Sequence, residues 1–128
     1  MRVEWLNEAR NEFLTFLKYY KTEVGAPYAK KFADKILRAT EQLADFPEMG
    51  VLKYDTLMGK HNFRALFMEQ YVCIYKIERD TVYIYHIADA RKNYIYHIFG
   101  AVDKVIRHFP NFAPYSEKRH RFGVILRI

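Results

Sequence analysis

The stretch that decides the fold is Ala44-Asp45-Phe46-Pro47-Glu48-Met49-Gly50. Before it, apolar residues recur every three or four positions, which is typical of amphipathic helices. After it they alternate with a period of two, which is typical of strands. Pro47 cannot continue a helix, and Gly50 lets the backbone turn into an extended segment. We therefore interpret residues 44–50, called the corner below, as the point where the chain changes from helix to sheet.

Before the corner, the pattern predicts a short strand and two helices. Residues 2–6 alternate polar and apolar side chains, and Asn7 is suited to cap a helix that runs to about residue 21. A second amphipathic helix is expected from Pro27 to about residue 45. The apolar stripe of the first helix leaves Glu8 and Glu12 on its outer side. The two helices should pack as an antiparallel hairpin.

After the corner, the alternation predicts a small antiparallel sheet followed by a helix and a tail. The expected strands are a weak one at 51–54 and stronger ones at 61–68, 71–78 and 81–87. A third amphipathic helix is expected over 95–109, where Pro110 ends it. The tail carries a basic cluster at 118–121 and an apolar run at 122–128. That run is expected to extend the sheet edge or to pair with a second copy of the chain as a homodimer.

The predicted fold class is therefore α+β, with an N-terminal strand, an antiparallel helical hairpin packed on a small antiparallel sheet of about four strands, and a C-terminal helix and tail. The length of 128 residues fits one domain over residues 1–96, with residues 97–128 packed on it or extending it. Cys73 stands alone in an apolar run, which excludes a disulfide framework and indicates a buried thiol in a reducing cytoplasm. No apolar run approaches the roughly 18 residues that span a bilayer, so no membrane association is expected.

The positive charge lies almost wholly after the corner. Residues 1–50 contain eight Lys and Arg against eight Asp and Glu, whereas residues 51–128 contain thirteen against seven. Such a field attracts RNA, DNA or an acidic protein, and it does not choose between them.

A set of residues recurs in fixed order over residues 3–96: Val3-Glu4-Trp5, Ala9, Ala29, Phe32, Ile36, Leu43, Phe46-Pro47-Glu48-Met49-Gly50, Phe63-Arg64, Tyr71, Tyr75, Val82 to Ile87 and Arg91-Lys92-Asn93. This ordered set resembles the RelE/ParE family of bacterial toxins. The long helical pair and the corner look closer to the ParE branch than to RelE.

The resemblance implies the toxin of a type II toxin–antitoxin pair, neutralised by a small antitoxin that is acidic where it lies across the sheet and hairpin. ParE-like members inhibit DNA gyrase by protein binding, and this is the function that we predict. RelE-like members cut mRNA on the ribosome, and this metal-independent endonuclease activity is the alternative. A diverged member without toxicity is the third possibility. Neither activity uses a metal or an organic cofactor.

The resemblance also indicates candidate residues for the endonuclease alternative. Arg64 and Arg91 match basic residues of the family and would clamp a phosphate. Tyr94, Tyr96 or His86 would transfer protons. Against these roles, the arginines are also typical of a surface or of an antitoxin-facing charge, and His86 of a half-buried, hydrogen-bonded strand residue.

One departure from the RelE pattern weakens the endonuclease alternative. RelE-like toxins have Tyr-Arg-x-x-Tyr where this chain has Tyr71-Val72-Cys73-Ile74-Tyr75, and Val72 cannot bind phosphate. Lys53 or Lys60 would have to compensate. The histidines are not spaced as in a zinc motif, so no metal is expected.

Overall fold

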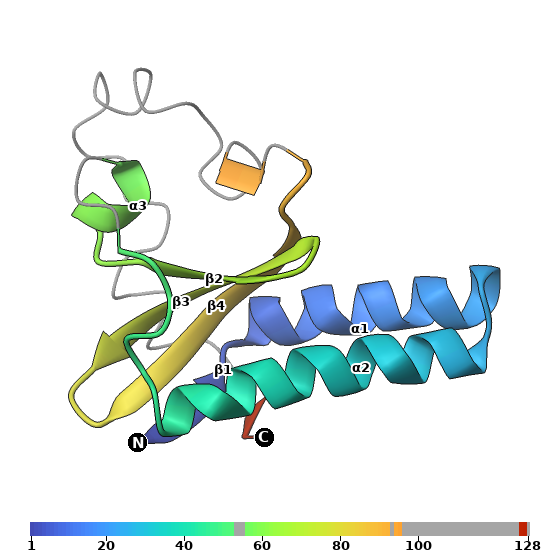
Figure 1. Ribbon diagram of the computed structural model, residues 1–128, viewed down its shortest axis with the longest axis horizontal. Coiled ribbons are helices and arrows are strands. Elements are labelled where there is room, and N and C mark those ends of the chain that lie inside the picture. The colour runs from blue at the N-terminus through green and yellow to red at the C-terminus, as the bar shows by residue number, and fades with distance from the viewer. Residues whose placement is uncertain (53–55, 93, 96–125, 128) are drawn as a thin grey trace.

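The computed structural model describes residues 1–52, 56–92, 94, 95, 126 and 127, which form a helical hairpin on one face of a sheet (Figure 1). The predicted α+β fold class is confirmed. Among the described residues, no helix is both long and apolar enough to cross a membrane. In chain order the elements are β1 (Arg2–Trp5), α1 (Asn7–Glu23), α2 (Ala26–Glu41), the 3-10 helix η1 (Gln42–Ala44), α3 (Leu57–Lys60), β2 (Arg64–Met68), β3 (Tyr71–Glu78), β4 (Thr81–Asp89) and β5 (Leu126–Arg127).

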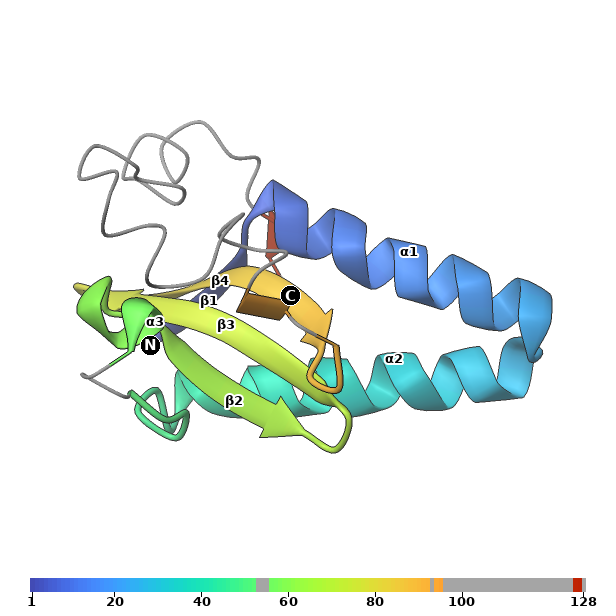
Figure 2. The same cartoon turned by 90° about the horizontal axis from the view of Figure 1, so that it is seen from above.

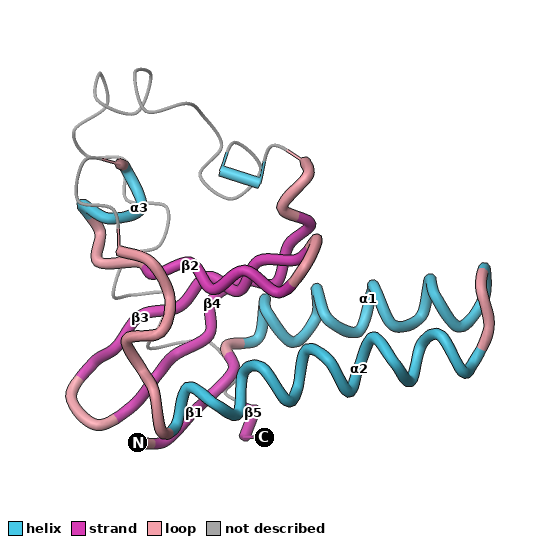
Figure 3. The backbone as a smooth tube through the Cα atoms, viewed as in Figure 1, coloured by secondary structure: helices cyan, strands magenta, loops and turns pink. Residues whose placement is uncertain are grey.

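The sheet has the strand order β2-β3-β4-β1-β5 and is mixed. Its strands are drawn in magenta in Figure 3. Strands β2, β3 and β4 form the expected antiparallel meander. Strand β1, however, runs parallel to β4, with Arg2 opposite Thr81 and Trp5 opposite Ile84. A parallel pair needs a long crossover, and the helical hairpin with the first two meander strands provides it. This position makes β4 a central strand.

The two ends of the described chain meet at the outer edge of β1. Strand β5 pairs antiparallel with β1, placing Arg127 opposite Glu4 and Leu126 opposite Trp5. The two residues thus extend the sheet edge. The predicted third helix beyond Ile95 and the tail up to residue 125 lie outside the described residues.

The helical hairpin covers one face of the sheet and projects past the strands (Figure 2). Gly25 joins the helices with φ of 135°, a conformation that favours glycine, and Pro27 lies in the first turn of α2 as predicted. Asn7 is already the first residue of α1, so the residue at the N-cap position is Leu6 and no side chain caps the helix. On each helix, the apolar stripe that the sequence predicts faces the sheet.

Two apolar clusters hold the layers together, one on each face of the sheet. The cluster under the helices contains Trp5, Phe13, Phe32, Ile36, Tyr71, Cys73, Tyr75, Ile84 and Ile87. The cluster on the other face contains Leu6, Met58, Phe63, Ala65, Val72, Ile74 and Tyr85. Burial of both faces of β3 agrees with its almost unbroken apolar sequence.

Two loop regions differ from the predicted pattern. The weak strand at 51–54 is a single bridge between Val51 and Ala65, and residues 53–55 lie outside the described part. The segment between the strands predicted at 51–54 and 61–68 contains the short helix α3, and β2 begins at Arg64 rather than at residue 61.

Candidate functional site

The side chain of Arg64 is directed at the backbone of the corner. Its guanidinium donates hydrogen bonds to the carbonyl oxygen of Gly50 at 2.9 Å and to that of Glu48 at 3.4 Å. Tyr75, which lies opposite Arg64 across β2 and β3, donates to the Pro47 carbonyl at 2.7 Å and accepts from the Gly50 amide at 2.8 Å. The observed contacts of Arg64 are thus structural, and its role toward phosphate stays a prediction.

Arg91 is held by a carboxylate just beyond the end of β4. Its Nε and terminal nitrogen donate to the two oxygens of Asp89 at 3.1 and 2.8 Å, and its backbone amide donates to the same carboxylate at 2.9 Å. The bidentate hydrogen bond from Arg91 lowers the pKa of Asp89 below its ordinary value, against the opposing effect of burial. Asp89 also raises the pKa of Arg91. The side chain of Arg91 remains 67% exposed.

The structure does not bring the two arginines together. Arg64 lies opposite Tyr75 of β3. Asp89, which binds Arg91, is the last residue of β4 and lies opposite Tyr71, the first residue of β3. Four residues along β3 correspond to about 13 Å, and two strand spacings add about 10 Å across the sheet. The predicted phosphate clamp would therefore require both side chains to leave their present partners.

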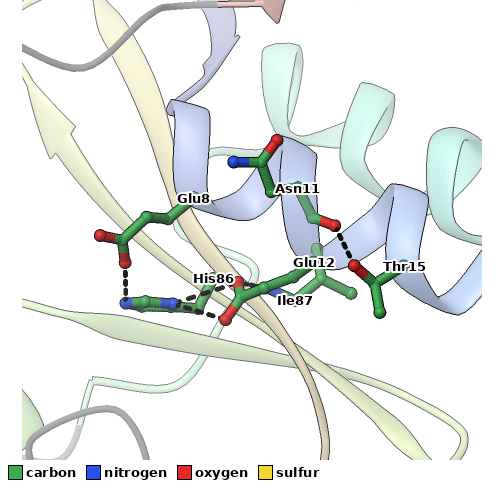
Figure 4. A network of polar contacts seen from close by, with 6 residues as sticks. All are labelled: Glu8, Asn11, Glu12, Thr15, His86 and Ile87. Atoms are coloured by element: carbon green, nitrogen blue, oxygen red, sulfur yellow. Dashed lines mark hydrogen bonds and ion pairs between the residues drawn. The ribbon is translucent and has the colours of Figure 1, made fainter.

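His86 is buried beneath the first turns of α1 (Figure 4). Its Nδ1 lies 3.0 and 3.1 Å from the two carboxylate oxygens of Glu12, and its Nε2 lies 4.0 Å from Glu8. Glu12 also accepts a hydrogen bond from the backbone amide of Ile87 at 3.1 Å. The imidazole is only 3% exposed, so a substrate would reach it only if α1 moved.

A bulge in β4 explains why His86 lies in this place. Ile74 pairs with His86 but Tyr75 pairs with Ile84, so Tyr85 is the extra residue. Such a residue shifts the alternation of a strand and redirects the side chains that follow. Ile84 and Ile87 consequently both face the helices although they are three residues apart.

Next to this network, α1 and the end of β4 border an open pocket of about 360 Å³. Tyr94 contributes to its wall, and burial raises the pKa of this phenol, which makes it a weaker acid than an exposed tyrosine. Among the predicted residues, His86, Arg91 and Tyr94 thus lie in one region and Arg64 in another, while Tyr96 lies outside the described residues. The pocket is lined by Asn11, Glu12, Thr15, Phe16, Ile87, Ala88, Asp89, Lys92 and Tyr94.

Glu12 and Asp89 are the site residues that the sequence analysis missed. Helical spacing placed Glu12 on the outer side of α1, but α1 passes the end of β4, and that flank faces the strand. The i, i+4 spacing of Glu8 and Glu12 was the available signal, since it puts two carboxylates on one flank. In the described residues, no group of three or more His, Cys, Asp or Glu could hold a metal ion.

Comparison with known proteins gives a family match and a structural match. The family model for the ParE toxin of the type II toxin–antitoxin system parDE matches residues 3–94. A solved structure described as the chromosomal ParDE toxin–antitoxin system from P. aeruginosa has a similar fold, with a TM-score of 0.60 and 16% sequence identity. The match covers 70% of this chain and 95% of that chain. The search of curated proteins gives no match.

Proposed function

The chain belongs to the ParE toxin family, and we propose that it is the toxin of a type II toxin–antitoxin pair that acts by binding DNA gyrase. Membership agrees with the resemblance to the ParE branch that was read from the helical pair and the corner. On this proposal the toxin acts through a surface that binds another protein and not through a catalytic centre.

The observation that favours gyrase binding over RNA cleavage is that Arg64 and Arg91 are both hydrogen-bonded within the chain. RNA cleavage without a metal needs cations at the phosphate and a proton-transferring group beside the ribose. Arg64 donates to corner carbonyls and Arg91 donates to Asp89. Arg64 and Asp89 lie about 13 Å apart along the strands and about 10 Å apart across them. A protein-binding surface needs no such convergence.

Val72, which stands where the RelE pattern Tyr-Arg-x-x-Tyr has its arginine, supports the same choice. It is fully buried in the cluster on the face opposite the helices, which also contains Ala65 and Ile74. An arginine there would bury a charge in an apolar cluster, at a cost of several kcal/mol. The chain therefore has an apolar core contact where an RNA-cleaving relative carries a phosphate ligand.

We further propose that the acidic antitoxin places an apolar side chain in the pocket between α1 and β4. Phe16 and Ile87 give this pocket apolar walls, and the exposed Lys92 supplies positive charge for a neighbouring carboxylate of the antitoxin. The two carboxylates of the lining, Glu12 and Asp89, are already bound to His86 and Arg91. The open reading frame next to this gene is the candidate antitoxin. Co-purification of its product with the chain tests the pairing.

A supercoiling assay with purified gyrase tests the target. The expected result is inhibition that rises with toxin concentration and disappears when the antitoxin is added in equal amount. Unchanged supercoiling at saturating, folded toxin would contradict the proposal.

The second candidate is the RelE-like endonuclease, favoured by one observation. Tyr94 lines the same pocket as Lys92 and Asp89, and Asp89 binds the exposed Arg91. Primer extension on a translated message would detect cleavage, and Arg64→Ala and Arg91→Ala should abolish it. Cleavage that survived both changes would reject these residues. Normal growth of a bacterial host that expresses the chain without antitoxin would show that the chain is a diverged family member without toxicity.

A further inference from the structure

The corner is held in place by residues from the sheet. Tyr75 bonds to Pro47 and Gly50, and Arg64 bonds to Glu48 and Gly50. A Cβ atom on Gly50 would lie 2.7 Å from the ring and hydroxyl of Tyr75, so only glycine fits. The backbone of this loop is therefore fixed before any partner binds.

The fixed loop exposes apolar side chains. Phe46 is 64% exposed and Met49 41%, and together they line an open hollow with Pro47 and Glu48. Val51 is 49% exposed at the bridge to β2. Single exposed apolar residues are ordinary, but three within six residues on a rigid loop form a patch. Phe46, Met49 and Val51 are called the corner patch below.

The corner patch has an acidic rim on a basic protein. Glu41, Asp45 and Glu48 are exposed, and residues 41–51 contain no Lys or Arg, although the chain has a net charge of +6. Within the described part of the chain, none of these three carboxylates forms an ion pair. Among the described residues, Arg64 is hydrogen-bonded to the corner carbonyls, the N-terminal ammonium donates to the Ala44 carbonyl at 3.0 Å, and the exposed Arg38 lies one helical turn before Glu41. Asp45 and Glu48 are thus the carboxylates that remain available beside Phe46 and Met49.

We propose that the corner patch docks a basic segment of the toxin's protein target. An arginine or lysine of that segment lies with its aliphatic stem on Met49 and its cation over the ring of Phe46, and pairs with Asp45 or Glu48. The proposal rests on the proposed function, because it assigns a surface to the same toxin.

Charge separates this surface from that of the antitoxin. An acidic antitoxin is drawn to the basic half of the chain and repelled by the carboxylates at the corner. A basic segment has the opposite preference. The rigid loop also lowers the entropic cost of binding, because little of it must be ordered.

Two sets of variants test the assignment with gyrase and the antitoxin as probes. Phe46→Ser with Met49→Ser removes the apolar contact, and Glu48→Lys alone reverses a rim charge. Val24→Ser and Glu23→Lys are matched controls, since both residues are exposed at the far tip of the hairpin. Circular dichroism and melting curves should match the wild type, because all the changed side chains lie at the surface.

The expected result is a loss of gyrase inhibition of about tenfold or more for both corner variants, with antitoxin affinity within about threefold of wild type. The control variants should inhibit as the wild type does. Full inhibition by either corner variant overturns the proposal. So does an equal loss of antitoxin binding, or a change in oligomeric state, since the patch would then face the antitoxin or a second copy.

Failure of the proposed function is distinguishable from failure of this inference. If the wild type does not inhibit gyrase, the gyrase proposal fails, and growth arrest on expression without antitoxin becomes the readout. Corner variants that no longer arrest growth would then support docking of another target, and variants that still arrest it would overturn the docking surface. A wild type that neither inhibits gyrase nor arrests growth overturns both.

Discussion

The hydroxyl of Tyr75 accepts a hydrogen bond from the amide of Gly50 at 2.8 Å, across 25 residues of chain. The same hydroxyl donates to the carbonyl of Pro47 at 2.7 Å. The turn from helix to sheet is thus fixed by the third strand as well as by its own proline and glycine. This contact links the feature that organises the fold to the surface that we assign to the target.

Tyr75→Phe should therefore destabilise the protein. The change leaves the Gly50 amide and the Pro47 carbonyl without their partner, which should lower the free energy of unfolding by about 1–3 kcal/mol. Urea denaturation measures this difference. Tyr19→Phe is the control, because Tyr19 is 60% exposed, and it should change stability by less than about 0.5 kcal/mol. Equal stability of the two variants would show that the hydroxyl does not hold the corner.

Glu12→Ala should also destabilise the protein, by detaching α1 from the end of β4. The carboxylate serves both His86 and the Ile87 amide, so its removal should lower the free energy of unfolding by about 1–3 kcal/mol. Denaturation of Glu23→Ala, exposed in the last turn of the same helix, gives the comparison. A Glu12 variant as stable as the Glu23 variant would contradict the network.

Asp89 should make stability fall in acid. Its pKa is lowered in the folded state by Arg91, so its contribution is complete above the unfolded pKa near 4. That contribution is lost as the pH falls through the folded pKa. Unfolding measured from about pH 6 to about pH 2.5 should show a smaller loss for Asp89→Asn than for the wild type. Arg91→Gln removes the cation and should flatten the curve as well; an unchanged slope in both variants would refute the pair.

Cys73 should be unreactive in the folded protein. It is fully buried under the helices, and burial raises the pKa of its thiol, so little thiolate is available for attack. A thiol reagent such as DTNB should label the native chain at the rate of global unfolding and the urea-denatured chain at once. Rapid labelling of the native protein would show that the helix-side core opens locally.

The corner, the hairpin and the meander could be predicted from the sequence because each leaves a local pattern. Pro47 and Gly50 mark the break, and the period of the apolar residues changes there. The pairing of β1 with β4 leaves no such pattern, since it joins Trp5 to Ile84 across most of the chain. A strand pattern shows that a strand exists and does not name its neighbour.

The site could be predicted only in part, for a similar reason. His86 is hydrogen-bonded, as one interpretation of the sequence expected, but it is fully buried rather than half-buried. The bulge at Tyr85 and the passage of α1 over β4 decide that Glu12 is its partner. Arg64 matched a family position, yet sequence does not show that its guanidinium bonds to corner carbonyls. These contacts depend on tertiary placement.

The most direct test of the account is the supercoiling of plasmid DNA by purified gyrase in the presence of the folded chain. The account predicts inhibition that depends on toxin concentration, is reversed by the antitoxin and is weakened by Phe46→Ser with Met49→Ser. Undiminished supercoiling, together with cleavage of a translated message that requires Arg64 and Arg91, would contradict it and identify the chain as an endonuclease.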